Sequence, residues 1–161
     1  MEFGEVVRRR RSIRKYKSDP VPDDVLQEIL EAGRLAPSGG NRQPWHFIVV
    51  KDPALKREMG IPDWASEAPV VLAVCGDPQE SPTWQVVDPT IAMEHMILAA
   101  TDKGLGTCWI GTLGNDERIK KVLGIPQRMK VIAVTPIGYP AESPPPKPRK
   151  SMDQIVHYDR F

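Results

Sequence analysis

Apolar residues follow two patterns along the chain. Some short runs are apolar almost throughout, which is typical of strands buried inside a sheet. Other stretches place apolar residues every three or four positions, which is typical of helices with a buried face. The continuous runs predict four strands, at 45–50, 70–75, 105–112 and 129–134. The periodic stretches predict five helices, at 2–9, 22–35, 52–59, 89–103 and 115–123.

Proline, aspartate, asparagine and glycine mark the ends of these helices. Pro22 is expected at the first position of the second helix, and Asp88 is expected to cap a helix that begins at Pro89. Gly104 ends that helix, and Asn115 is expected to cap the next one. The helix that begins at Pro89 is apolar on nearly all sides, so we expect it to be the central, buried helix.

Helices and buried strands are interleaved, which predicts an α+β or α/β fold whose sheet is mostly covered. A chain of 161 residues fits one domain, 1–161. This length is modest for enclosing a cofactor as well as a core, so a partner subunit could supply missing walls. Residues 143–150 are rich in proline and predict an extended arm.

Charge and cysteine content narrow the class of protein. The 22 basic and 21 acidic residues give a net charge of +1 and a pI near 7.8, which argues against a dedicated nucleic-acid binder. No signal peptide and no apolar stretch of membrane-spanning length is visible, so we expect a soluble, cytoplasmic protein. Cys75 and Cys108 are too few for a disulfide framework. The three histidines, His46, His95 and His157, are too dispersed for a metal site.

Positive charge is concentrated between Arg8 and Lys17, where seven of ten residues are cations. Arginine presents a planar set of donors that suits phosphate or carboxylate, and a serine hydroxyl adds a further donor. We therefore predict an anion site that contains Arg10, Ser12 and Arg14. The same composition is compatible with a solvated charge run or a nucleic-acid-binding arm.

The loop at 36–45 contains two glycines and two prolines. Glycine permits close backbone approach and proline restricts the chain, so the loop suits a flat ligand, although it could be an ordinary connection. Gly104 and Gly106 do not form a dinucleotide fingerprint, because a helix precedes them and a strand follows. No hydrolytic nucleophile with a base is visible. These features indicate a cofactor that carries its own reactivity.

Five short motifs, taken in chain order, resemble the FMN-dependent nitroreductase family over nearly the whole chain. They are Arg10-Arg11-Ser12-Ile13-Arg14; Ala36-Pro37-Ser38 with Asn41 and Gln43-Pro44-Trp45; Gly104-Leu105-Gly106 with Trp109-Ile110-Gly111; Gly138-Tyr139-Pro140; and Lys147-Pro148-Arg149. The resemblance implies an α+β fold with a mixed central sheet flanked by helices. It also implies an intertwined homodimer that holds FMN between its subunits, with the arm at 141–161 reaching over the partner.

The resemblance also implies a set of cofactor-binding residues. The N-terminal arginines and serine would hold the FMN phosphate and ribityl chain and reach the pyrimidine edge, and the C-terminal cations would close on the phosphate. The partner's loop would lie near the flavin ring, and a backbone N–H of the 109–111 segment would bond to flavin N5 or O4. The residues are Arg10, Arg11, Ser12, Arg14, Pro37, Ser38, Asn41, Trp109, Ile110, Gly111, Lys147 and Arg149.

The reaction implied is ping-pong hydride transfer from NAD(P)H through FMN N5 to a nitroaromatic, a quinone or a similar small acceptor. No side-chain acid or base is then required. A cation near flavin N1 and O2, for which Arg14 is the candidate, would raise the reduction potential. Members of the family that remodel flavin or dehalogenate aromatic compounds are alternatives, as is a flavin-binding regulatory protein without turnover.

One departure from the family pattern concerns 59–69, which is compressed around Trp64. Relatives often place a lid or a polar contact to the flavin there. Within it, the stretch 61–69 is expected to be irregular, with Trp64 as either a core residue or a pocket wall. Loss of a lid would leave a more open, less selective site.

Overall fold

The computed structural model describes residues 1–161, and its centre is one sheet in the order β1-β2-β5-β3, with β4 also paired to β5. All strand ladders are antiparallel, and the parallel pairing is an isolated bridge between Ser12 and Thr107. The strands are β1 (Trp45–Val50), β2 (Val70–Gly76), β3 (Gly106–Thr107), β4 (Ile110–Gly111) and β5 (Lys130–Gly138).

Both faces of the sheet are covered, as the apolar runs predicted. Every residue of β2 is buried, and its side chains alternate between two cores, because successive residues of a strand point to opposite faces. Leu72 and Val74 join the core with helices α2 (Asp23–Arg34) and α5 (Val87–Asp102), whereas Ala73 and Cys75 join the core with α6 (Glu117–Leu123). Strand β1 lies at the sheet edge and is only partly covered in its middle.

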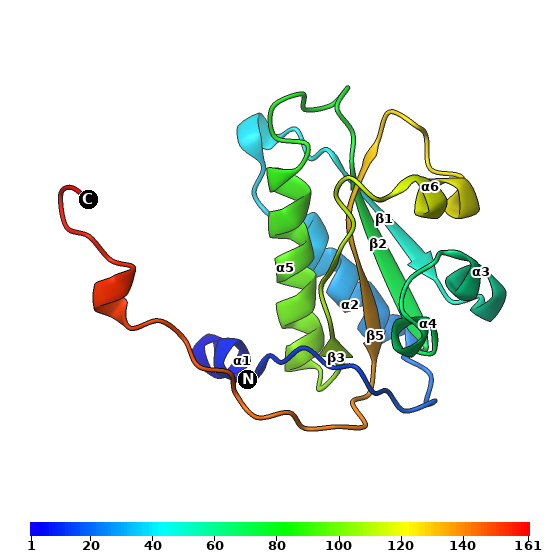
Figure 1. Cartoon of the computed structure of the whole chain (residues 1–161), viewed down its shortest axis with the longest axis horizontal. Coiled ribbons are helices and arrows are strands. Elements are labelled where there is room, and N and C mark those ends of the chain that lie inside the picture. The colour runs from blue at the N-terminus through cyan, green and yellow to red at the C-terminus, as the bar shows by residue number, and fades with distance from the viewer.

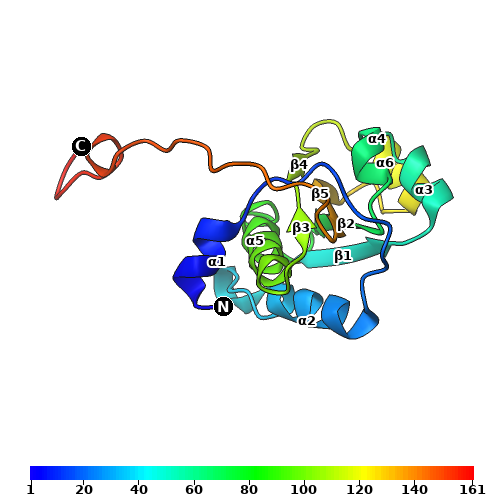
Figure 2. The same ribbon diagram turned by 90° about the horizontal axis from the view of Figure 1, so that it is seen from below.

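Helices α2 and α5 pack on one face of the sheet, and the short helices α3, α4 and α6 gather at the other side (Figures 1 and 2). None of the helices has the length and apolar character needed to cross a membrane. The helices are α1 (Phe3–Arg9), α2 (Asp23–Arg34), α3 (Pro53–Glu58), α4 (Asp63–Ser66), α5 (Val87–Asp102) and α6 (Glu117–Leu123), with 3-10 turns η1 (Gly39–Asn41) and η2 (Met152–Gln154).

The third predicted strand, 105–112, was wrong as a continuous strand. The structure divides it into β3 and β4 at Cys108 and Trp109. Continuing the β3–β5 register would place Cys108 opposite Pro136, which has no backbone N–H to donate. Cys108 N instead donates to Thr135 Oγ1 at 3.2 Å. The strand is therefore interrupted at Cys108 and Trp109.

The fourth predicted strand, 129–134, was too short, because β5 continues through Pro136 to Gly138. Pro136 would normally mark the end of a central strand. Here it lies opposite Val71 on one side and opposite the interruption between β3 and β4 on the other. The strand thus continues past proline because the neighbouring strand is broken at the same level.

Two predicted caps were also wrong. Helix α5 begins at Val87, and Asp88 accepts a hydrogen bond from Gly39 N at 3.2 Å instead of capping its own helix. Helix α6 follows Asp116 instead of Asn115, and the Asp116 carboxylate accepts from Val131 N at 3.0 Å. At both helix ends the aspartate beside the first turn accepts a hydrogen bond from a distant backbone N–H and does not cap its own helix.

The segment at 61–69, expected to be irregular, contains helix α4. The prolines around it limited the apolar periodicity to a single turn. By contrast, Gly104 follows α5 with a φ of +74°, so the prediction that it stops this helix is confirmed.

The C-terminal residues form an arm that leaves the body of the molecule. After Tyr16 and Pro140 pair in an isolated bridge, the chain runs outward without strand pairing and ends beyond η2 (Figures 1 and 2). The extended conformation predicted for 143–150 is confirmed. The large apolar side chains near the end of the arm are all more than half exposed: Met152, Ile155, Tyr158 and Phe161.

Candidate functional site

The arginine segment follows directly from the end of helix α1. Arg10 N donates to Val6 O at 2.9 Å, and Arg11 Nη1 donates to Arg8 O at 2.6 Å and to Arg10 O at 2.8 Å. These donors satisfy carbonyls that the end of a helix leaves free. The chain then becomes extended, and the side chains beyond Arg11 are presented by a fixed backbone.

That backbone is attached to the edge of the sheet. Ile13 N donates to Thr107 O at 2.8 Å, and the Ile13 side chain is buried so closely against Gly106 that a Cβ there would lie 2.8 Å from Ile13 Cγ1. Tyr16 Oη donates to Ile13 O at 2.6 Å, and burial raises the pKa of Tyr16, so its phenol keeps this proton. Ser12 and Arg14 flank a residue that is firmly packed.

The C-terminal arm passes along the same segment. Lys17 N donates to Tyr139 O and Ala141 N donates to Lys15 O, both at 2.9 Å, so the two stretches run antiparallel. Arg14 N donates to Glu142 Oε1 at 2.5 Å. Backbone pairing therefore brings the two ends of the chain together beside β3.

A pocket of about 370 Å³ opens where these two stretches meet. Six of its lining residues are cations, none is acidic, and none of the six takes part in an ion pair of the structure. A cluster of cations without acidic partners favours the binding of an anion. The lining is Val7, Arg8, Arg10, Arg11, Ser12, Arg14, Pro144, Pro145, Pro146, Lys147 and Arg149.

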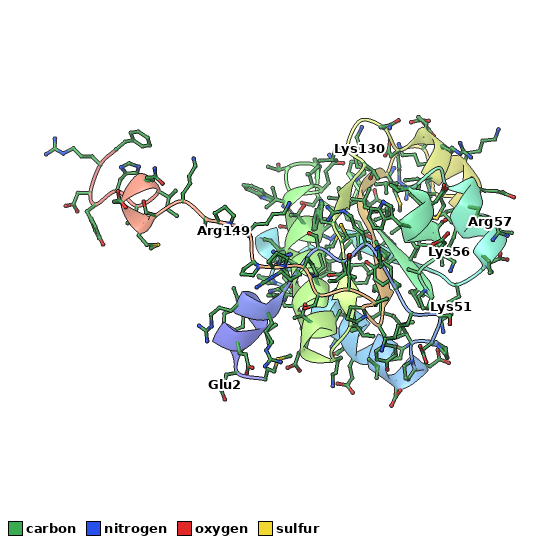
Figure 3. The ribbon with its side chains drawn as sticks, turned by 60° about the horizontal axis from the view of Figure 1, so that its bottom comes forward. Glu2, Lys51, Lys56, Arg57, Lys130 and Arg149 are labelled. Carbon is green, nitrogen blue, oxygen red and sulfur yellow. The ribbon has the colours of Figure 1, made fainter.

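The structure thus brings together six of the twelve predicted site residues, the four from the N-terminal segment and the two from the arm. Figure 3 shows Arg149 where the arm leaves the body, on the same side as α1. Arg149 Nη1 donates to the carbonyls of Lys147 and Pro148, at 3.2 and 3.1 Å. Arg14 Cζ lies over the Trp64 ring, 5.7 Å from its centroid.

The predicted loop residues Pro37, Ser38 and Asn41 lie elsewhere. Their loop contacts the first turn of α5 through the Gly39–Asp88 hydrogen bond. The arginine segment lies near the other end of α5, and Figure 1 shows the two regions at opposite ends of this helix. One chain alone does not bring the loop to the pocket.

The loop itself has an unusual backbone. Gly40, Asn41 and Gln43 all have positive φ, at 61°, 54° and 51°. Non-glycine residues rarely adopt this conformation, and side chains support it here. Ser38 Oγ accepts from Gln43 N at 3.0 Å, and Gln43 Nε2 donates to Asn41 O at 3.2 Å. The loop therefore has a defined shape beyond that of a simple connection.

The predicted residues Trp109, Ile110 and Gly111 do not line the pocket either. They follow Thr107, which anchors Ile13, and they form the break and the short strand beside β5. Trp109 and the nearby Leu113 expose 39% and 56% of their surface. This stretch is therefore an open apolar edge next to the arginine segment.

Sequence reasoning missed some pocket residues. Arg8 lies in the last turn of α1 and belongs to the same cationic run as Arg10 and Arg11, so it could have been included. The three prolines of the arm directly precede Lys147, so their position could have been inferred as well. Glu142, which is outside the lining and accepts from Arg14 N, could not have been inferred, because a single acidic residue in a loop has no pattern.

A model of the nitroreductase family matches residues 7–60 and 60–139, which is most of the chain. The chain belongs to the nitroreductase family. A Methanothermobacter thermautotrophicus relative, which carries the provisional name of NADH dehydrogenase/NAD(P)H nitroreductase, is 36% identical over all of this chain and 88% of its own.

Other similar proteins support the fold, and their names cover more than one kind of reaction. The structure of an FMN-dependent nitroreductase from Clostridium difficile is 31% identical, with a TM-score of 0.87 over 97% of this chain and 98% of that one. Iodotyrosine deiodinase 1 of Rattus norvegicus is 28% identical, over 96% of this chain and 68% of its own length. The expected nitroreductase-like α+β fold is confirmed.

Proposed function

We propose that this chain is an FMN-dependent oxidoreductase that passes hydride equivalents from NAD(P)H to a small acceptor such as a nitroaromatic or a quinone. The observation that carries the proposal is the pocket with six cations and no acid, contributed by both ends of a nitroreductase-family chain. Such a donor set fits the phosphate of a flavin nucleotide.

The residues present fit this group on chemical grounds. A phosphate monoester carries nearly two negative charges, and it would relieve the mutual repulsion of cations that have no acidic partner. Arg10, Arg11, Ser12, Lys147 and Arg149 would hold the phosphate and the ribityl chain. Arg14, which is further along the segment, would reach the pyrimidine edge.

We further propose that the site is completed by a second copy of the chain. The loop with Pro37, Ser38 and Asn41 is shaped for a close approach, yet it lies at the other end of α5 from its own pocket. In a homodimer the partner's loop would cover the flavin ring. The arm at 141–161 would reach over the partner and bury its exposed apolar residues.

When bound, FMN supplies the hydride chemistry at N5, so the protein needs no acid or base of its own. The residues of the chain would bind the cofactor and orient its ring. The 109–111 segment would offer a backbone N–H to the ring, and the Arg14 charge would favour the electron-rich form of the cofactor.

An absorbance spectrum of the purified protein, followed by anaerobic addition of NADH and then NADPH, tests the proposal. We expect flavin absorbance that either nicotinamide bleaches and that a quinone or nitroaromatic restores. A protein without flavin, which also fails to bind added FMN, would overturn the assignment. Bound flavin that neither nicotinamide bleaches would instead indicate a flavin-binding protein without turnover.

The deiodinase relatives favour a second candidate, reductive dehalogenation of an aromatic substrate. The same reduced protein distinguishes it. Halide release from iodotyrosine, in proportion to flavin reoxidation, would support dehalogenation. Reoxidation by quinone without halide release from iodotyrosine would favour the first candidate.

A further inference from the structure

The Arg14 guanidinium has an unusual position among the pocket cations. Its Cζ lies 5.7 Å from the centre of the Trp64 ring, over the face of the indole, and it has no carboxylate partner. An aromatic face attracts a cation without using its N–H groups. A salt bridge would use those donors, whereas the contact with the aromatic ring leaves the N–H groups of Arg14 free.

Trp64 is carried by an element that cannot easily move. Helix α4 is a single turn, and the buried Lys56 is tied to the chain just after it, because its Nζ donates to Ala68 O at 2.5 Å and to Pro69 O at 3.3 Å. Ala65 and Ala68 are completely buried. The indole is therefore held against the body of the protein.

Arg14 is fixed equally well at its backbone. Its own N–H donates to Glu142 Oε1, and the preceding Ile13 is anchored to Thr107. With the Cα fixed and the guanidinium resting on Trp64, the flexible methylenes between them have few arrangements left. Such preorganisation lowers the entropy that ligand binding would otherwise cost.

Trp64 lies close to the point where the match to the family model is divided in two. The two stretches matched by the family model meet at Gly60, at the end of α3 and just before α4. Gly60 has a φ of +72°, and a Cβ there would lie 2.8 Å from Arg118 Cδ. A tight turn at this glycine brings α4, and with it Trp64, directly to the arginine segment.

We propose that Trp64 is a positioning residue that aims the in-plane donors of Arg14 at the pyrimidine edge of the flavin. The inference rests on the proposed function. Trp64 acts through Arg14, setting the orientation of its charge, and therefore influences both FMN affinity and the reduction potential of the bound cofactor. Aromatic character, beyond the space that the side chain fills, is the property that this role requires.

Two variants separate these properties. Trp64→Phe keeps an aromatic face, whereas Trp64→Leu fills part of the same space without one. We expect FMN to bind about three- to tenfold more weakly to Trp64→Leu and within about twofold of wild type to Trp64→Phe, the range that cation–π contacts of this exposure support. The midpoint potential of the bound FMN should become more negative in Trp64→Leu and stay near wild type in Trp64→Phe.

A double-mutant cycle with Arg14→Ala completes the test. In that background Trp64→Leu should change neither FMN affinity nor potential further, while thermal unfolding of the flavin-free proteins reports any loss of stability separately. Equal effects of Leu and Phe, additive effects in the cycle, or no effect of Arg14→Ala would each overturn the inference. These outcomes all require a wild-type protein that binds FMN, so they are distinguishable from failure of the proposed function.

Discussion

At the scale of single residues, the pocket depends on side chains that have charge and no partner. Some exposed arginines of the chain pair with a nearby acid, as Arg9 does with Glu5 and Arg34 with Glu31. Arg10 and Arg149 have no such pair and face the same pocket from opposite ends of the chain. A bound anion is the arrangement that would give both a counter-charge.

Replacing Arg10 or Arg149 with Ala should weaken FMN binding about ten- to a hundredfold, because each change removes a charged hydrogen-bond donor. The free energy of unfolding should change by less than about 0.5 kcal/mol, since neither guanidinium contacts the core. Fluorescence titration of FMN and urea denaturation measure the two effects.

Arg57→Ala is a matched control for these variants. Arg57 is exposed on α3, on the opposite side of the body from Arg149 (Figure 3). Its replacement should leave FMN affinity unchanged. An FMN affinity equal to wild type in both pocket variants would contradict the phosphate assignment.

At the scale of elements, buried polar groups attach the short helices to the sheet. Lys120 Nζ on α6 lies 3.1 Å from Asp116 Oδ2, and both side chains are almost fully buried. Burial alone would raise the pKa of Asp116, but the Val131 N–H and the Lys120 ammonium more than offset it and hold this pKa below its ordinary value. The pair therefore joins the start of α6 to β5.

Replacing Lys120 with Met should destabilise the protein by about 3 kcal/mol near neutral pH, because it leaves a buried carboxylate without its cation. Since the folded pKa of Asp116 is depressed, the contribution of the pair is complete above the ordinary pKa of about 4 and is lost as the pH falls through the folded value. The difference from wild type should then shrink in acid.

Urea denaturation of Lys120→Met at a series of pH values measures this dependence. Lys121→Met is the control, because the neighbouring Lys121 is exposed and should lose little stability when replaced. A penalty that is the same at pH 3 and pH 7 would show that the lost stability comes from packing instead of charge.

Close packing fixes a second junction, at the end of β2. A Cβ added to Gly76 would lie 1.7 Å from the backbone oxygen of Gln85. Gly76→Ala should therefore destabilise the protein by about 3 kcal/mol, the upper part of the range for overpacking, because backbone cannot yield as a side chain does. Gly111→Ala, where the added Cβ has only an ordinary contact at 3.8 Å, is the control in thermal unfolding.

At the scale of the whole molecule, the proposed homodimer would account both for the exposed arm and for the separation of the loop from the pocket. The exposed apolar residues recur every third position at the end of the arm, beyond any contact with the chain's own core. Exposed apolar groups of this number are typical of an interface. They are the surface that a homodimer would cover.

Replacing Met152, Ile155, Tyr158 and Phe161 together with Ser should weaken dimerisation by about two orders of magnitude or more, because four apolar side chains would no longer be buried. Light scattering at micromolar concentration measures the change, and FMN content should fall with it. Serine at four polar positions, Lys150, Asp153, Asp159 and Arg160, provides the control. A flavin-loaded wild-type monomer would refute the shared site.

Features that depend on neighbours in the sequence were predicted correctly, whereas features that depend on distant partners were not. The strands at 45–50 and 70–75 and the stop at Gly104 depend on near neighbours in sequence, and they were predicted correctly. Asp88 was misread as a cap because Gly39, far along the chain, donates to its carboxylate. The cap predicted at Asn115 was misplaced by one residue, and the carboxylate of the observed N-cap residue, Asp116, accepts from Val131 in β5. Local patterns carry no information about such partners.

By itself, the sequence determined the interleaving of helices with buried strands, the covered sheet and the identity of the cations beside α1, because apolar periodicity and side-chain chemistry are local properties. The tertiary structure decided where these cations meet. Antiparallel pairing of 15–17 with 139–141 brings Lys147 and Arg149 to Arg10, and a tight turn at Gly60 precedes the helix that brings Trp64 to Arg14. Such contacts depend on the path of the whole chain, which no stretch of the sequence specifies alone.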